Sequence, residues 1–222
     1  MYFVYKTQYN LKIMIEHPNI GRRVYNILYR QIVSGKLPQG TRLKEEHLTK
    51  QLGVSRTPLR DAIGRMVNDG YLYVEPRRGA RVRKFGAQDI AEIYDIRKAL
   101  ETLAVRLSAG KITGQELNEL KNTFSRRDVE SLWQADRRLH DLIVRRCGNR
   151  RLIEMLENIY RLICIFRRKG YRSSERVRNA GRQHLRIIEA LLKDDVGAAE
   201  KVMSEHIEST KQEIIHELGT PG

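Results

Sequence analysis

Three histidines and one aspartate in the second half of the chain have the types and the spacing of a metal-binding set. Asp136 and His140 are four residues apart, so in a helix they share one face. His184 and His206 stand eleven residues before and eleven residues after Asp195. An antiparallel helical hairpin that turns at Asp195 brings both imidazoles to about the same level. Together the four side chains form a ligand set suited to a divalent metal (Zn, Ni or Mn), with positions left for water or substrate.

Spacing alone leaves simpler interpretations open. An Asp/His pair at four-residue spacing is commonly a surface ion pair, and a single histidine in a helix is commonly solvated or satisfied inside the core. His17, His47 and His216 have no comparable neighbours in the sequence, and we expect them at the surface.

The elements that must position these residues are helices. From Asp89 onward every long segment has apolar residues at helical spacing, and Gly110, Gly148 and Gly170 each stand where one helix ends. The predicted helices cover 89–109, 117–125, 129–147, 150–169, 175–193 and 196–217. The sequence therefore predicts an all-α bundle of about six helices over residues 89–217, joined to the preceding part by a linker over 85–88.

Residues 20–84 have a different organisation. Helices are predicted over 21–34, 45–52 and 56–69, with Ser55 as the N-cap of the third helix and Pro58 in its first turn. Two short alternating runs, 71–74 and 80–83, flank Pro76-Arg77-Arg78-Gly79 and predict a hairpin with a basic tip. Three helices followed by such a hairpin make a winged helix-turn-helix, so the chain is predicted to be mainly α.

A helix that enters the major groove reads base edges with side chains near its N-terminal end. Arg56, Thr57 and Arg60 occupy that place, and with Ser55 they are the predicted DNA-binding residues of this helix. We expect Arg42 and Lys44 to hold phosphates. Arg77 and Arg78 at the hairpin tip can enter the minor groove or clamp the backbone, where Gly79 allows close approach.

Charge supports a nucleic-acid partner for the first part of the chain only. The formal net charge of the whole sequence is +15. Residues 20–84 hold 15 Lys and Arg against five Asp and Glu, whereas residues 85–222 hold 25 against 21. A basic first domain beside a nearly balanced second one fits double-stranded DNA bound by the first domain alone.

Other features predict a cytoplasmic protein. Cys147 and Cys164 lack CxxC spacing, which favours a reducing compartment, and no apolar run approaches the length of a membrane span. Residues 1–19 are predicted to be an N-terminal arm. Within it, residues 1–13 are either a flexible arm or an upstream extension of the reading frame, since Met14 stands just before the first helix.

The first domain resembles the winged helix-turn-helix of GntR-type bacterial transcription regulators. The resemblance rests on Gly40-x-x-Leu43, on Leu52-Gly53-Val54-Ser55-Arg56-Thr57-Pro58-Leu59-Arg60-Asp61-Ala62-Ile63, and on Arg78-Gly79. Departures from the family pattern are small: Gln39 splits a usual Pro-Gly pair, Thr49 stands where Ala is common, and Ile63 replaces Leu.

The second domain resembles FCD, the helical effector domain of the FadR-type branch of these regulators. The matching pieces are Tyr94-Asp95-Ile96-Arg97-x-x-Leu100-Glu101, Asp136-x-x-Leu139-His140, Gly148-Asn149, His184-x-x-Ile187-Ile188 and Val202-Met203-x-x-His206. Many FCD domains bind a metal through one Asp and three His, and the resemblance implies that role for Asp136, His140, His184 and His206. It also implies a small carboxylic acid effector, whose far end could pair with Arg97.

These features predict a ligand-responsive transcription regulator, most simply a repressor, that acts as a homodimer on a palindromic operator. The resemblance to bacterial regulators implies a location in the bacterial cytoplasm, in association with the nucleoid. It is not predicted to be an enzyme. A metal-dependent hydrolase with a DNA-binding appendage is one alternative, but no general base comparable to the Glu of HExxH stands near the four candidate ligands. A second alternative is a regulator that senses the metal ion itself, and a third is a purely structural metal.

Overall fold

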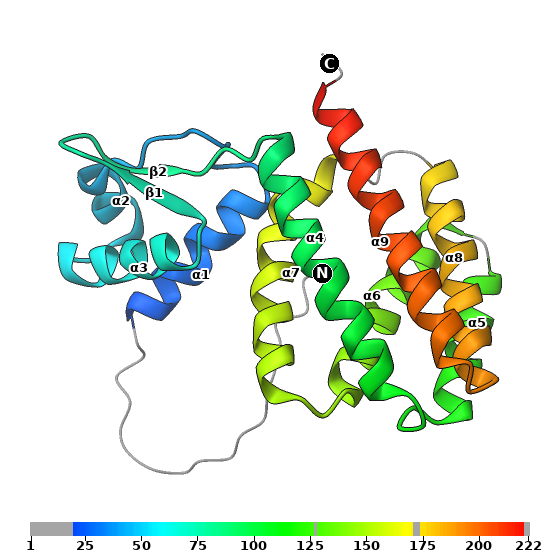
Figure 1. Ribbon diagram of the computed structural model, residues 1–222. Coiled ribbons are helices and arrows are strands. Elements are labelled where there is room, and N and C mark those ends of the chain that lie inside the picture. Colours follow the sequence, from blue (N-terminus) through cyan, green and yellow to red (C-terminus); the bar gives the residue numbers. More distant parts are fainter. Residues whose placement is uncertain (1–19, 127, 171–173, 220–222) are drawn as a thin grey trace, which may run out of the picture.

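The computed structural model of the protein describes residues 20–126, 128–170 and 174–219. These residues form a small lobe and a helical bundle, which lie side by side in Figure 1. Apart from one two-stranded sheet, the elements of the described residues are helices, which confirms the predicted fold class. The predicted N-terminal arm, residues 1–19, lies outside the described residues. Among the described helices, none has the length and apolar character needed to cross a membrane.

The small lobe contains the three predicted helices and the predicted hairpin. They are α1 (Ile20–Val33), α2 (Glu45–Leu52), α3 (Arg56–Asn68), β1 (Leu72–Glu75) and β2 (Gly79–Val82). The two strands are antiparallel, with Leu72 opposite Val82. Apolar side chains at helical spacing bury one face of α1 and one face of α3, among them Leu28, Leu59 and Met66, none of which is exposed to solvent. This small core holds α3 in place beside the hairpin.

The bundle consists of the six predicted helices. They are α4 (Ala87–Ser108), α5 (Gly114–Ser125), α6 (Val129–Arg146), α7 (Arg150–Gly170), α8 (Ser174–Leu192) and α9 (Val196–Gly219). Helix α5 begins three residues before the predicted Leu117 because Thr113 and Glu116 form a capping box. The Thr113 hydroxyl accepts from the Glu116 N–H at 3.2 Å, and the Thr113 N–H donates to the Glu116 carboxylate at 2.9 Å.

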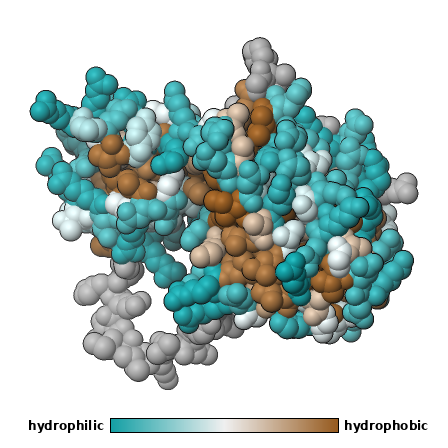
Figure 2. Space-filling view, in the orientation of Figure 1, coloured by the Kyte–Doolittle hydropathy of each residue, from teal (hydrophilic) through white to brown (hydrophobic). Residues whose placement is uncertain are grey.

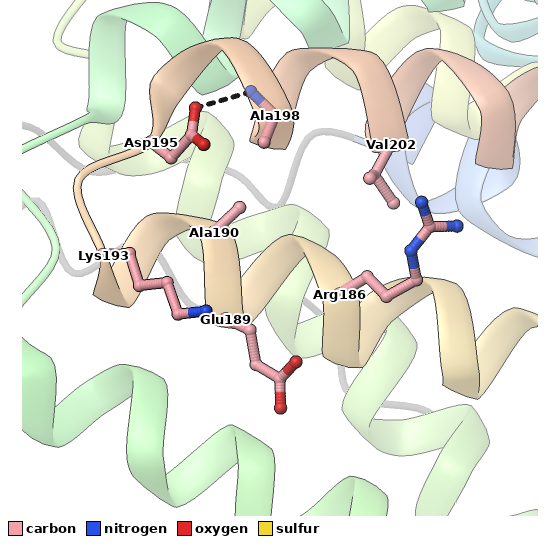
Figure 3. A pocket seen from close by; sticks show the side chains of 7 residues that line it. All are labelled: Arg186, Glu189, Ala190, Lys193, Asp195, Ala198 and Val202. Atoms are coloured by element: carbon pink, nitrogen blue, oxygen red, sulfur yellow. Dashed lines mark hydrogen bonds between the residues drawn. The ribbon is translucent and has the colours of Figure 1, made fainter.

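Helices α8 and α9 form the antiparallel hairpin that the equal spacing of His184 and His206 requires. The turn between them contains Asp194, in a left-handed conformation with φ of 55°. Asp195 then starts α9, since its carboxylate accepts a hydrogen bond of 2.9 Å from the Ala198 N–H (Figure 3). With the turn centred here, residues equally far from Asp195 on the two helices lie opposite one another.

The lobes are joined by a covalent connection and by packing of the small lobe against α7. The covalent connection is short, because β2 ends at Val82 and α4 begins at Ala87, two residues earlier than predicted. Phe85 in this connection is buried, and its N–H donates to the Gln39 side chain at 3.1 Å. The second contact comes from α7, where a Leu162 methyl carbon lies 3.6 Å from the position that a Cβ on Gly70 would occupy. The small lobe is therefore packed against the bundle as well as tethered to it.

Candidate metal centre and nucleic-acid interface

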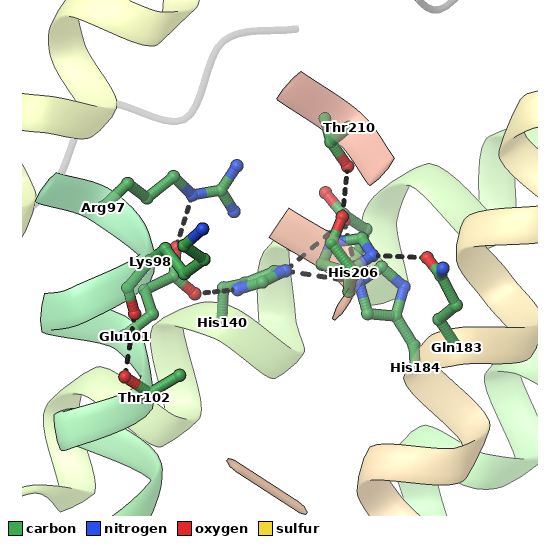
Figure 4. Close-up of polar contacts among 10 residues, drawn as sticks. Arg97, Lys98, Glu101, Thr102, His140, Gln183, His184, His206 and Thr210 are labelled. Carbon is green, nitrogen blue, oxygen red and sulfur yellow. Dashed lines mark hydrogen bonds and ion pairs between the residues drawn. The ribbon is translucent and has the colours of Figure 1, made fainter. Parts of the chain in front are cut away.

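The fold brings the four predicted ligands together inside the bundle. Asp136 and His140 come from α6, His184 comes from α8 and His206 comes from α9. One ligand atom from each residue lies within 4.8 Å of the others. All four side chains are buried, so the interpretation as a surface ion pair and solvated histidines is wrong. Figure 4 shows the three imidazole rings converging from different helices.

Four of the six distances between these atoms are close to those of ligands around one small ion. His184 Nε2 lies 3.2 Å from His140 Nε2 and 3.2 Å from His206 Nε2. Asp136 Oδ1 lies 3.2 Å from His184 Nε2 and 3.6 Å from His140 Nε2. Zinc bonded tetrahedrally at about 2.0–2.1 Å holds its ligand atoms about 3.3–3.4 Å apart. The residues present therefore fit a divalent ion without rearrangement of the helices.

Two outer contacts orient the rings. His206 Nδ1 donates to the Gln183 carbonyl oxygen at 2.9 Å, and His140 Nδ1 donates to the Glu101 carboxylate. A neutral imidazole that carries its proton on Nδ1 has a lone pair on Nε2. The Nε2 lone pairs of both rings therefore face the centre of the cluster, which is the arrangement that a metal ligand needs.

The electrostatics of the cluster favour the neutral form of His206. Burial, followed by the neighbouring His184 and His140, holds the pKa of His206 well below its usual range. Only a neutral imidazole binds a metal, so a depressed pKa keeps the ligand form present at neutral pH. Lone pairs that face each other in a dry interior repel one another unless a cation lies between them.

Arg97 lies beside this cluster and is held by Glu101. Its side chain is completely buried, and its Nε donates to Glu101 Oε1 at 2.5 Å. The guanidinium packs over the rings of Tyr94 and Tyr160, at 5.2 Å and 5.7 Å from their centroids. Burial alone would raise the pKa of Glu101, but the Arg97 charge and the contact with His140 outweigh it and lower that pKa to about 2. In this conformation the predicted effector residue is closed off from solvent, and its role in effector binding stays a prediction.

Sequence reasoning missed two residues of this site. Glu101 belongs to the Arg97-x-x-Leu100-Glu101 motif, and its spacing of four from Arg97 placed both on one helix face, which was a usable signal. Gln183 carried no signal apart from its place next to His184, because an outer partner can come from any polar side chain that packs against the ring.

The predicted recognition residues lie at the start of α3. Ser55, Arg56 and Thr57 are exposed there. Ser55 is the N-cap residue as predicted, and its hydroxyl makes no capping hydrogen bond. Arg60 is also exposed, and its Nε donates to Glu45 on α2 at 2.9 Å. Reading a base with Arg60 therefore requires exchange of this exposed ion pair.

The hairpin presents the remaining predicted DNA contacts. Arg77, Arg78 and Gly79 are exposed at its tip. Arg77 has a φ of 63°, an uncommon conformation for a residue with a side chain. Arg42 and Lys44 are exposed too, and Arg42 forms a β-bridge with Arg81 on the second strand of the hairpin. Arg42 is thus positioned by the hairpin as well as by its place before α2, while the DNA contacts themselves stay predictions.

Comparison with known proteins agrees with both halves of this description. Residues 20–82 match the family described as bacterial regulatory proteins, gntR family, and residues 92–209 match the FCD domain. The HTH-type transcriptional regulator YdhC of Bacillus subtilis is 32% identical over 203 residues, which cover 87% of this chain and 90% of the relative. The HTH-type transcriptional repressor RspR of Escherichia coli is 26% identical and covers 88% of this chain and 89% of its own.

Two solved structures extend the comparison to three dimensions. Escherichia coli McbR/YncC has a TM-score of 0.68 at 27% identity, and the match covers 91% of this chain and 99% of that one. The Zn²⁺-bound FCD domain of TM0439 has a TM-score of 0.53 at 25% identity, and the match covers 62% of this chain and 99% of that domain. The relatives are named as transcription regulators and not as enzymes, which sets the hydrolase alternative aside. The chain belongs to the GntR family of bacterial transcription regulators, in the branch whose second domain is an FCD domain.

Proposed function

We propose that this regulator is a repressor whose FCD domain binds one divalent metal ion and a small carboxylic acid effector in the bacterial cytoplasm. The observation that carries the proposal is the convergence of three imidazole Nε2 atoms and one carboxylate in a buried cluster. A nitrogen and oxygen ligand set of this kind suits Zn, Ni or Mn. RspR, a relative of similar length, is named a repressor, which supports that direction of regulation.

The metal is held by Asp136, His140, His184 and His206. A bound ion would supply positive charge and an open coordination position, to which a carboxylate oxygen can bind. The Zn²⁺-bound FCD domain among the structural relatives supports zinc as the first ion to test.

The acid effector is proposed to reach Arg97, which can pair bidentately with a carboxylate. Because Arg97 is completely buried and already held by Glu101, an acid gains access only when the surrounding helices move. The effector then binds only to an open bundle, so its binding shifts the population from the closed bundle described here to the open one.

Such a movement has a direct route to the DNA-reading lobe. Arg97 lies on α4, and only four residues separate the end of the hairpin strand β2 from the start of α4. Tyr160, which packs on Arg97, is two residues from Leu162, the α7 side chain that contacts Gly70 of the small lobe. Displacement of α4 or α7 therefore changes the position of α3, which is how two separate sites become coupled.

The protein is proposed to act as a homodimer that pairs through α4. One face of this helix is buried in its own bundle, while Ile96 is 55% exposed and Leu103 is 36% exposed on another face. With three partly buried residues they form an apolar row at alternating spacing of three and four, namely Ile93, Ile96, Leu100, Leu103 and Leu107. This is the spacing with which two helices pack together. Figure 2 shows apolar side chains gathered over α4.

A regulator that senses the metal ion itself is a second candidate. Four side chains are enough to fill the four positions of a tetrahedral site, and the cluster is closed to solvent. Sites that are closed in this way usually keep their ion without adding a substrate. This candidate differs from the first in one outcome, since metal alone would change operator affinity and carboxylic acids would not.

The decisive experiment measures the metal content of the purified protein by elemental mass spectrometry, beside a variant that carries both His184→Ala and His206→Ala. We expect about one equivalent of Zn, Ni or Mn per chain in the natural protein and none in the variant. Circular dichroism of the metal-free forms verifies that the variant is folded. Absence of metal from the natural protein, even after incubation with Zn²⁺, Ni²⁺ and Mn²⁺ salts, would contradict the proposal and leave DNA binding as the remaining function.

A further inference from the structure

One buried carboxylate connects the candidate metal centre to the candidate effector residue. Glu101 is completely buried, on the same face of α4 as Arg97. Its Oε1 accepts from Arg97 Nε at 2.5 Å, and its Oε2 accepts from His140 Nδ1. The two oxygens of a single side chain therefore satisfy two donors from two different elements, α4 and α6, as Figure 4 shows.

Only an ionised carboxylate can do this. It accepts at both oxygens and donates at neither. A Gln at this position has one carbonyl oxygen and one NH₂ group. If the carbonyl accepted from His140, the NH₂ would face the Arg97 N–H, and if it accepted from Arg97, the NH₂ would face His140 Nδ1. In the second arrangement the imidazole would move its proton to Nε2 and lose the lone pair that faces the metal centre.

The far end of the cluster is supported differently. His206 Nδ1 donates to the carbonyl oxygen of Gln183, whose side chain is a neutral amide. The contrast indicates that the charge on Glu101 has a purpose beyond holding a ring. A carboxylate behind a ligating imidazole makes the imidazole a stronger donor to the metal.

We propose that Glu101 is a positioning residue, which keeps the proton of His140 on Nδ1 and ties the His140 ring to the Arg97 guanidinium. This inference rests on the proposed function of the four ligands as a metal site. It adds that the affinity for the metal depends on a residue outside the ligand set, and that Arg97 and the metal centre are linked through one side chain.

The test compares Glu101→Gln with the natural protein in Zn²⁺ titrations against a chromophoric chelator. Glu101→Gln is expected to weaken Zn²⁺ affinity by about 10–100-fold. The matched control is Glu208→Gln on α9, which replaces a carboxylate paired with Lys98 and Lys211 outside the cluster. That control should bind Zn²⁺ as the natural protein does, even if its melting temperature falls slightly.

A second readout needs no metal. Long-range ¹H–¹⁵N spectra of metal-free, ¹⁵N-histidine-labelled protein report which ring nitrogen carries the proton. The His140 signals are assigned by their loss in His140→Gln. We expect His140 protonated on Nδ1 in the natural protein and a shift of the proton toward Nε2 in Glu101→Gln.

A double variant distinguishes a changed hydrogen-bond pattern from misfolding of Glu101→Gln. In Arg97→Gln/Glu101→Gln, the new side chain at position 97 can place its amide oxygen where Arg97 has its Nε, because both atoms are bonded to Cδ. This oxygen can accept a hydrogen bond from the NH₂ group introduced at position 101. The amide carbonyl at position 101 is then left to accept from His140. The double variant should regain the Nδ1 proton and part of the Zn²⁺ affinity that Glu101→Gln loses.

The outcomes distinguish failure of the proposed metal site from failure of the proposed role of Glu101. A natural protein that binds no Zn²⁺ contradicts the metal site, while the ¹⁵N spectra still test the tautomer of His140. A natural protein that binds Zn²⁺, together with a Glu101→Gln variant of equal affinity and unchanged His140 signals, would overturn the role of Glu101. Loss of affinity in the double variant equal to that in Glu101→Gln would also contradict it.

Discussion

Asp136 Oδ1 on α6 lies 3.2 Å from His184 Nε2 on α8. Taken alone, this pair could be an ion pair with the proton on Nε2. The same Nε2 also lies 3.2 Å from the Nε2 atoms of His140 and His206. One proton can serve only one of these three neighbours, whereas one divalent ion at the centre would serve all four ligand atoms. The geometry of this pair therefore favours coordination over a simple hydrogen bond.

Metal binding should raise thermal stability. A ligand that binds only the folded state at 100 times its dissociation constant adds about 2.7 kcal/mol to the free energy of unfolding. For a chain of this size we expect the melting temperature to rise by about 5–11 °C when Zn²⁺ is added to chelator-treated protein. Differential scanning fluorimetry measures the shift. Asp136→Asn should lose most of it, and an equal shift in that variant would count against Asp136 as a ligand.

The dimer proposal predicts the effect of charges on α4. Ile96→Glu combined with Leu103→Glu places two carboxylates in the apolar row, and we expect the mass in solution to fall to that of one chain by light scattering. Loss of bivalent contact should weaken operator binding at least about 100-fold. Met155→Glu is a matched control, because Met155 is an exposed apolar residue of α7. A double variant that stays dimeric would show that the subunits pair elsewhere.

Substitution of Arg77 should affect DNA binding without lowering stability. Its φ of 63° is strained for Arg and unstrained for Gly. Arg77→Gly should therefore keep the free energy of unfolding or raise it by up to ~1 kcal/mol, while the slope of log affinity against log salt falls by about one. Arg145→Gln on α6 removes the same charge from the bundle and should leave the slope unchanged. An unaltered slope in Arg77→Gly would mean that Arg77 touches no phosphate.

The contact between Leu162 and Gly70 should control detachment of the lobes. Leu162 is half-buried, so Leu162→Ala is expected to cost about 1 kcal/mol in this contact. Trypsin can cut after Lys84, an exposed residue of the connection, once the connection opens. Limited proteolysis at this site should therefore be about fivefold faster in Leu162→Ala. Met155→Ala, on the same helix, should be cut at the natural rate; equal acceleration in both variants would indicate general loosening of α7.

The capping box of α5 predicts a pH dependence. The Thr113 N–H, followed by Arg146, lowers the pKa of Glu116 from 4.5 to about 2. The unfolded chain takes up this proton first as pH falls, so the stabilisation is fully present above pH 4.5 and disappears between pH 4.5 and about 2. Glu116→Gln should melt below the natural protein at pH 7, and the difference should shrink across that window in thermal scans followed by circular dichroism. A difference that stays constant with pH would contradict an ionised cap.

The family and the elements could be predicted from the sequence because their signals are local. Helical periodicity, the Gly-Val-Ser-Arg-Thr-Pro turn and the basic hairpin each depend on residues close together in the chain. Equal spacing of His184 and His206 around Asp195 carried information across two helices, since a hairpin has only one register once its turn is known. The hydroxyl of Ser55 shows the limit of such reasoning, because it occupies the capping position without making the capping bond.

The sequence by itself determined the helices, the winged hairpin, the basic charge of the first domain and the identity of the four candidate ligands. Only the tertiary structure decided that Asp136 and His140 on α6 meet His184 and His206, that the site is closed to solvent, and that Glu101 joins Arg97 to His140. The physical reason is that ring orientation and burial depend on how separate helices pack. Helix packing depends on many weak contacts between residues that are distant in sequence, so it cannot be predicted from a local sequence pattern.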